Sequence, residues 1–260
     1  MSNNEFTILA STVIDRISAK LDRFLKPPNK SRKICENPRQ ALMDFDIISK
    51  EEYDGYIIDL NLPNLIESID QNLKKGLPES RYFLVKKWRD FTDWIEILVS
   101  LYCLVRATKP SKVVETGIGE IGMTSTFILR GLEDNGKGEL FSIDTDKFYR
   151  IYGYHVGRGI PDCLRKNQRI VLGSSQKELI PLLKDVGPID IFLHDGDHKY
   201  RTKYFEYETS YPHLNKGGMI VSDDTWDSSF DVFVSNLRLM NRSVKYGKGN
   251  FFSFAKKQGE

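Results

Sequence analysis

Three aspartates follow two short apolar runs of this 260-residue chain, and their types and spacing suit metal chemistry. Asp195 comes after a run at 189–193, and the pair Asp223 and Asp224 comes after a run at 219–221. If both runs are parallel strands, their carboxyl ends share one edge of a sheet, where ligands bind. Converging carboxylates repel one another unless a cation or a proton joins them, and Mg²⁺ prefers such oxygen ligands. The pattern therefore predicts a Mg²⁺ site at the three aspartates; the alternative is that they cap a helix and order a loop.

A candidate general base lies beside this cluster. His198 is three residues beyond Asp195, and a neutral imidazole with a pKa near ~6.5 can accept a proton near pH 7. Asp197 is a competing candidate, and His198 can alternatively pack or cap at the start of a helix. His194 points the other way along its strand and is expected to be structural. The segment 194–198 thus predicts proton transfer next to the metal.

A glycine-rich turn provides a second kind of site. Gly117 and Gly119 lie between an apolar run at 112–115 and a helical pattern, and glycine lets a backbone turn tightly against a ligand. The same spacing fits a dinucleotide-binding turn, so the turn by itself does not distinguish NAD from S-adenosylmethionine. Glu115 favours S-adenosylmethionine, because a carboxylate attracts the ammonium group of that cofactor and repels the pyrophosphate of NAD.

Further candidate cofactor residues follow the next two runs. Asp144 ends the run at 140–143, where its carboxylate can accept hydrogen bonds from ribose hydroxyls, although it can also be the N-cap of a helix. Gly173 and Ser174 follow a run at 170–172, where the adenine edge is expected, or form an ordinary turn. The predicted cofactor-binding set is Glu115, Thr116, Gly117, Gly119, Asp144, Gly173, Ser174 and Asp195.

The elements that must position these residues alternate from residue 112 onward. Apolar runs of strand type are separated by helical patterns, which is typical of βαβ units with a parallel sheet. Two apolar alternating runs in 244–254 meet at a glycine-rich turn and predict an antiparallel hairpin. We expect an α/β fold with a Rossmann-like doubly wound sheet, mostly parallel, with a C-terminal antiparallel hairpin strand. The expected strands are 112–115, 140–143, 170–172, 189–193 and 219–221, and the expected helices are 124–133, 149–165, 176–184 and 200–214.

The first third of the chain is expected to be a helical N-terminal extension. Apolar residues at three- and four-residue steps from Phe6 to Leu25 predict an amphipathic helix, followed by a polar, basic loop to about residue 40. Further helices are expected at 64–75 and 90–108. We therefore divide the chain into an extension or lid, 1–85, and a cofactor-binding catalytic domain, 86–260.

Composition excludes several classes of protein. The formal charge of +2 provides no strong field for nucleic acid, and no apolar run approaches the ~18 residues of a membrane span. Cys35, Cys103 and Cys163 lack the spacing of a zinc site or a disulfide framework, which favours a reducing, cytoplasmic location. The apolar first helix is a candidate surface for a homodimer.

Four segments together resemble the successive motifs of class I S-adenosylmethionine-dependent methyltransferases, over roughly residues 85–256. Ile121 departs from them at the usual third-glycine position. The likeness is greatest to the macrocin/mycinamicin sugar O-methyltransferases and their cephalosporin-hydroxylase-like relatives. The resemblance implies that Asp195, Asp223 and Asp224 hold a metal. The segments are VVETGIGEIG (113–122), SIDTD (142–146), IFLHDGDHKY (191–200) and GGMIVSDD (217–224).

The sequence therefore predicts a Mg²⁺-dependent O-methyltransferase that acts on a small hydroxylated molecule, such as a sugar or a natural product. A metal-free N- or O-methyltransferase is one alternative. An NAD-dependent oxidoreductase is disfavoured by Glu115 and by the lack of a Tyr-x-x-x-Lys pair in the later half. A non-catalytic module that only binds S-adenosylmethionine is the remaining alternative.

Overall fold

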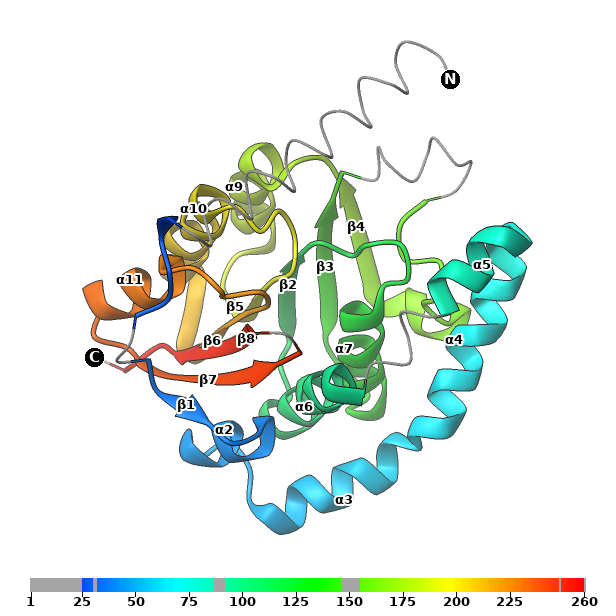
Figure 1. Cartoon of the computed structure of the whole chain (residues 1–260), viewed down its shortest axis with the longest axis horizontal. Coiled ribbons are helices and arrows are strands. Elements are labelled where there is room, and N and C mark those ends of the chain that lie inside the picture. The colour runs from blue at the N-terminus through cyan, green and yellow to red at the C-terminus, as the bar shows by residue number, and fades with distance from the viewer. Residues whose placement is uncertain (1–24, 30–31, 87–91, 146–154, 248, 260) are drawn as a thin grey trace.

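A single eight-stranded sheet organises the chain, in the order β1-β7-β8-β6-β5-β2-β3-β4 (Figure 1). The computed structural model describes residues 25–29, 32–86, 92–145, 155–247 and 249–259, so nearly all of the first predicted helix lies outside the described residues. The strands are β1 (Ile34–Cys35), β2 (Lys112–Thr116), β3 (Glu139–Asp144), β4 (Gln168–Leu172), β5 (Ile189–His194), β6 (Leu214–Ser222), β7 (Met240–Tyr246) and β8 (Asn250–Lys256).

The sheet confirms the predicted doubly wound topology. The chain moves outward from β2 to β3 and β4, then returns to β5 and β6 on the other side of β2, and these five strands are parallel. The predicted hairpin is formed by β7 and β8, and β8 runs antiparallel to both β6 and β7. Because the order reverses between β2 and β5, their carboxyl ends form the edge at which ligands bind in such sheets.

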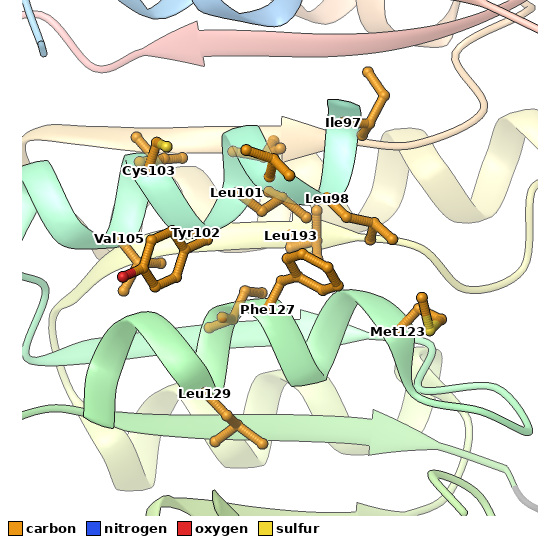
Figure 2. Close-up of a cluster of buried hydrophobic side chains, with 14 of the residues drawn as sticks. Ile97, Leu98, Leu101, Tyr102, Cys103, Val105, Met123, Phe127, Leu129 and Leu193 are labelled. Atoms are coloured by element: carbon orange, nitrogen blue, oxygen red, sulfur yellow. The ribbon is translucent and has the colours of Figure 1, made fainter. Parts of the chain in front are cut away.

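Alternating side chains of the central strands build two cores. Val113 faces one core, which contains α6 (Thr92–Thr108) and α7 (Met123–Asp134), and its neighbour Val114 faces the other. Figure 2 shows Tyr102, Phe127 and Leu193 gathered in the first of these cores. The second core contains side chains of α9 (Ser175–Val186), α10 (Tyr200–Ser210) and α11 (Ser229–Asn236). Burial on both faces explains why these strands are nearly continuous apolar runs.

The N-terminal helices pack into the first of these two cores. They are α2 (Pro38–Asp44), α3 (Lys50–Leu60), α4 (Leu62–Gly76) and α5 (Glu79–Lys86). Leu65, Ile69 and Leu73 recur at four-residue steps on α4, and all three are buried against the same cluster as α6 and α7. Figure 1 shows α3, α4 and α5 as an arc along one side of the molecule. The boundary at residues 85 and 86 stays a prediction.

Two predictions of local structure were wrong. The segment expected as a loop up to residue 40 contains β1, which pairs in parallel with β7, and the start of α2. The second is the helix predicted at 149–165. Among the described residues of this segment, Gly157 has a φ of +71°, and only a 3₁₀ helix, Asp162–Asn167, follows Pro161.

The three cysteines are free. None of the described helices has the length and apolar character needed to cross a membrane.

Candidate active site

The glycine turn after β2 touches the loop after β5. Gly117 has a φ of +88°, and a Cβ added there would lie 2.0 Å from the carbonyl oxygen of Asp195. The amide of Asp195 in turn donates to the carbonyl of Thr116 at 2.8 Å. Only glycine permits this approach, so one residue joins the predicted cofactor loop to the predicted metal loop.

Asp144 fastens the glycine loop. It ends β3, and its Oδ2 accepts hydrogen bonds from the amides of Ile118 at 2.8 Å and Gly119 at 3.0 Å. The amide of Gly173 donates to the backbone carbonyl of Asp144 at 2.9 Å. The structure therefore brings together the carboxylate predicted to bind ribose, the glycine loop and the first residue after β4.

Glu115 is fully buried beneath the glycine loop. Ser125 donates to its Oε1 at 2.5 Å and Ser142 at 2.6 Å, while its Oε2 has no hydrogen-bond partner among the described residues. Burial raises the pKa of this carboxyl to about 7. Buried polar atoms without a partner are rare and costly in native proteins, so Oε2 is an acceptor suited to a cationic ligand group.

Thr116 does not join this set through its side chain. Its hydroxyl is buried and donates to Glu206 of α10 at 2.7 Å, on the face of the sheet opposite Glu115. His194 lies on the same side, fully buried, with its Nδ1 2.6 Å from Glu206. Both contacts bind α10 to the sheet below the site, and this agrees with the expectation that His194 is structural.

A cavity of about 550 Å³ opens beside β4, and Ile170 and Leu172 of that strand line it. In the sheet, β4 is separated from β5 by β3 and β2. The cavity therefore lies towards the edge of the predicted cofactor half and away from the aspartates. Its lining residues include Asn72, Lys75, Arg158, Arg165, Ile170 and Leu172.

Two of the predicted acidic residues converge with His198. Ligand atoms of Asp195, His198 and Asp223 all lie within 4.8 Å of one another. Burial, followed by the charge of Asp223, raises the pKa of Asp195 well above its ordinary value, and burial together with the charge of Asp224 raises that of Asp223 to about 7. Such mutual repulsion would be relieved by a cation. Carboxylate and imidazole groups in this arrangement fit a divalent metal ion.

Asp224 lies at the side of this group. Its backbone is left-handed, with a φ of +50°, and its Oδ2 is 3.4 Å from Nε2 of His198. The hydroxyl of Tyr246 donates to Asp224 at 2.8 Å and also to Asp223. Tyr246 reaches both because it ends β7, which runs parallel to β6. No pattern in the sequence identified Tyr246 as a site residue, although the predicted hairpin placed it at the end of a strand.

The surroundings of His198 favour the neutral imidazole, a form that can bind a metal ion but is a weaker base than an ordinary histidine. Burial lowers its pKa to about 4, and its Nδ1 has no hydrogen-bond partner among the described residues. Its ring packs edge-to-face on Trp226, with centroids 5.6 Å apart. The competing candidate, Asp197, turns towards α10, where it accepts a hydrogen bond from Thr202 at 3.0 Å and lies 3.4 Å from Nζ of Lys199.

Basic residues from outside the predicted motifs also hold the site. Arg81 of α5 donates from Nε to Glu120 in the glycine loop at 2.7 Å. Arg32, placed by the sequence in a basic loop, is instead buried, and it bonds the backbone at Thr225 and at Asp227. The sequence contains no local signal for these contacts, because each joins segments far apart in the chain.

Comparisons with known proteins relate the central part of the chain to methyltransferases. Residues 114–225 match a family model described as a methyltransferase domain. A search of curated proteins found no match. Among solved structures, a protein from Klebsiella pneumoniae whose name assigns it O-methyltransferase activity is similar, with a TM-score of 0.55, 16% identity and coverage of 79% of this chain and 96% of its own. CalS11, named as a TDP-rhamnose 3′-O-methyltransferase of calicheamicin biosynthesis, has a TM-score of 0.50 and 12% identity, and the match covers 75% of this chain and 93% of CalS11.

Proposed function

We propose that the chain is a class I S-adenosylmethionine-dependent methyltransferase, and that it methylates a hydroxyl oxygen of a small molecule with the help of a divalent ion. The observation that carries this proposal is the convergence of Asp195, His198 and Asp223 within 4.8 Å, at the edge next to the glycine loop. The O-methyltransferase names of the two structural neighbours agree with this acceptor atom.

The cofactor half of the proposal rests on the placement of Glu115 and Asp144 at the glycine loop. Oε2 of Glu115 would accept from the ammonium group of S-adenosylmethionine, directly or through water. Asp144 would bind the ribose hydroxyls, since it lies against the glycine loop. Gly173 and Ser174, which directly follow β4, would border the adenine.

The acceptor half needs alignment and removal of one proton. Methyl transfer discharges a sulfonium that is already activated, so the protein mainly holds the acceptor oxygen in line with the methyl carbon. We propose that Asp195, Asp223 and Asp224 hold Mg²⁺, which when bound would lower the pKa of an acceptor hydroxyl. His198, neutral near pH 7, would accept the proton, with Asp197 as the competing base.

The most specific part of the proposal is the chemical class of the methyl acceptor. CalS11 is named for a sugar nucleotide, and the carboxylate cluster suits a molecule that offers two neighbouring hydroxyls to a metal. A sugar or a hydroxylated natural product meets this requirement.

Calorimetry tests the cofactor and the metal separately. We expect S-adenosylhomocysteine to bind and NAD not to bind; the reverse result would contradict the cofactor assignment. Mn²⁺, used as a probe for the divalent site, should bind the wild-type protein and should bind Asp223→Asn at least about 100-fold more weakly. Equal affinity in both proteins would show that these aspartates do not form the site.

A further inference from the structure

One lysine lies behind the loop that carries two of the proposed metal ligands. We define the acidic loop as residues 223–228, between β6 and α11. Lys203 of α10 is fully buried, and its Nζ lies 2.5 Å from Oδ2 of Asp227. The same ammonium donates to the backbone carbonyl of Asp224 at 2.9 Å and lies 4.9 Å from the ring centre of Trp226. Three of the six loop residues therefore contact one buried cation.

The carbonyl that Lys203 holds belongs to a strained residue. Asp224 has a φ of +50°, and a left-handed conformation is less favourable for a residue with a Cβ than for glycine. In an extended strand, consecutive side chains point to opposite faces. Here the carboxylates of Asp223 and Asp224 instead meet the same hydroxyl, that of Tyr246. The left-handed turn is what brings two consecutive carboxylates to one side.

The ion pair with Asp227 allows the charged ammonium of Lys203 to be buried where it can hold the carbonyl of Asp224. A single buried charge is strongly unfavourable, and a buried ion pair adds little net stability compared with apolar residues of similar size. Oδ1 of Asp227 also accepts the amide of Ser229 at 2.8 Å, at the start of α11. Asp227 therefore neutralises Lys203 and connects it to the next helix, so the ammonium has a fixed place behind the turn.

We propose that Lys203, held by Asp227, is a positioning residue that fixes the left-handed turn at Asp224 and thereby aims Asp223 and Asp224 at the metal. This inference rests on the proposed function. Lys203 is enclosed by protein and does not touch the acceptor. Arg32 supports the same loop at Thr225 and Asp227, and among the described residues it forms no hydrogen bond with Asp224.

The test compares Lys203→Met with Lys257→Met. Lys257 also donates to backbone carbonyls, including that of Leu214 at 2.7 Å, but at the opposite end of β6. Groups that orient metal ligands typically change metal affinity by about 10- to 100-fold. We therefore expect Lys203→Met to bind Mn²⁺ at least about tenfold more weakly, with S-adenosylhomocysteine affinity unchanged, and Lys257→Met to bind both ligands like the wild type.

A double variant separates positioning from stability. Lys203→Met leaves Asp227 buried without its partner, which can destabilise the whole protein, whereas Lys203→Met/Asp227→Asn removes both charges and should recover the lost stability. If Lys203 is a positioning residue, the double variant stays weak for Mn²⁺. Recovery of wild-type Mn²⁺ affinity in the double variant would overturn the proposal.

Hydrogen exchange distinguishes this inference from the proposed function. Failure of the wild-type protein to bind Mn²⁺ would contradict the proposed metal site, but the turn can still be observed without metal. In that case the amides of the acidic loop decide: faster exchange at Asp223 and Thr225 in the double variant supports the role of Lys203. Unchanged exchange there would overturn it.

Discussion

The glycine loop after β2 and the acidic loop after β6 lie at the same edge of the sheet, yet they are held by different kinds of contact. The glycine loop is fixed by a residue of another motif segment, since Asp144 of segment 142–146 accepts hydrogen bonds from the amides of Ile118 and Gly119. The acidic loop is fixed by Lys203 and Tyr246, which lie outside the four motif segments. The support of the first loop therefore comes from residues that the motifs contain, whereas the support of the second depends on the completed fold.

Substitution of Gly117 should disrupt the glycine loop together with the loop after β5, which carries Asp195, and have the largest effect. The new Cβ of Gly117→Ala would clash with the backbone of Asp195, and we expect unfolding to become easier by about 5 kcal/mol, measured by urea denaturation. Gly136 is the matched control, because its φ is +65° but nothing lies within 4 Å of an added Cβ. Gly136→Ala should cost only about 1 kcal/mol. Equal effects would show that the close approach of the loops is unimportant.

Arg32→Met should weaken the support of the acidic loop and leave the glycine loop intact. Arg32 forms a buried ion pair with Asp231 at 2.7 Å, and loss of one partner from such a pair costs about 3–5 kcal/mol. The exposed pair of Arg39 and Asp54 provides the control, since Arg39→Met should cost less than about 1 kcal/mol. We expect the remaining folded protein to bind S-adenosylhomocysteine normally. A large loss of cofactor affinity would mean that the two loops are not supported independently.

Asp223→Asn should separate metal binding from stability. We expect Mn²⁺ affinity to fall by at least about 100-fold. Without metal, however, the variant should be at least as stable as the wild type, because a carboxyl that repels Asp195 and Asp224 has been removed. Thermal denaturation with and without Mn²⁺ measures both effects. A variant that is clearly less stable without metal would show that Asp223 is mainly a structural residue.

Glu115→Gln should change how the stability of the protein depends on pH, and so test the buried carboxyl beneath the glycine loop. The pKa of Glu115 is about 7 in the folded protein, raised from 4.5 by burial, so between these values the folded protein holds a proton that the unfolded chain has lost. The wild type therefore loses stability from this group as pH rises. From pH 5 to pH 8 we expect its free energy of unfolding to fall by about 2.5 kcal/mol more than that of Glu115→Gln. Parallel pH profiles of the two proteins would contradict the buried state of this carboxyl.

The sequence predicted the apolar strands and the consecutive residues of the motifs, and missed the contacts that arise only from packing of the fold. The central strands were recognisable because burial on both faces makes them apolar, and the glycine loop because its residues are consecutive. Lys203 lies on a helix where a lysine is usually solvated, and only the packing of α10 against the acidic loop shows its contacts. Strand β1 has two residues, too few for any pattern, and it forms because β7 offers an edge.

The position of β8 between β6 and β7 has a consequence for how the chain folds while it is being synthesised. Strand β7 does not pair with β6. Both strands pair with residues 250–256, which are translated after the other seven strands of this sheet. Until then β6 presents an open edge, and unpaired strand edges promote aggregation of nascent chains. A frameshift or a stalled ribosome shortly before residue 250 should therefore yield an insoluble product even though both site loops have already been translated.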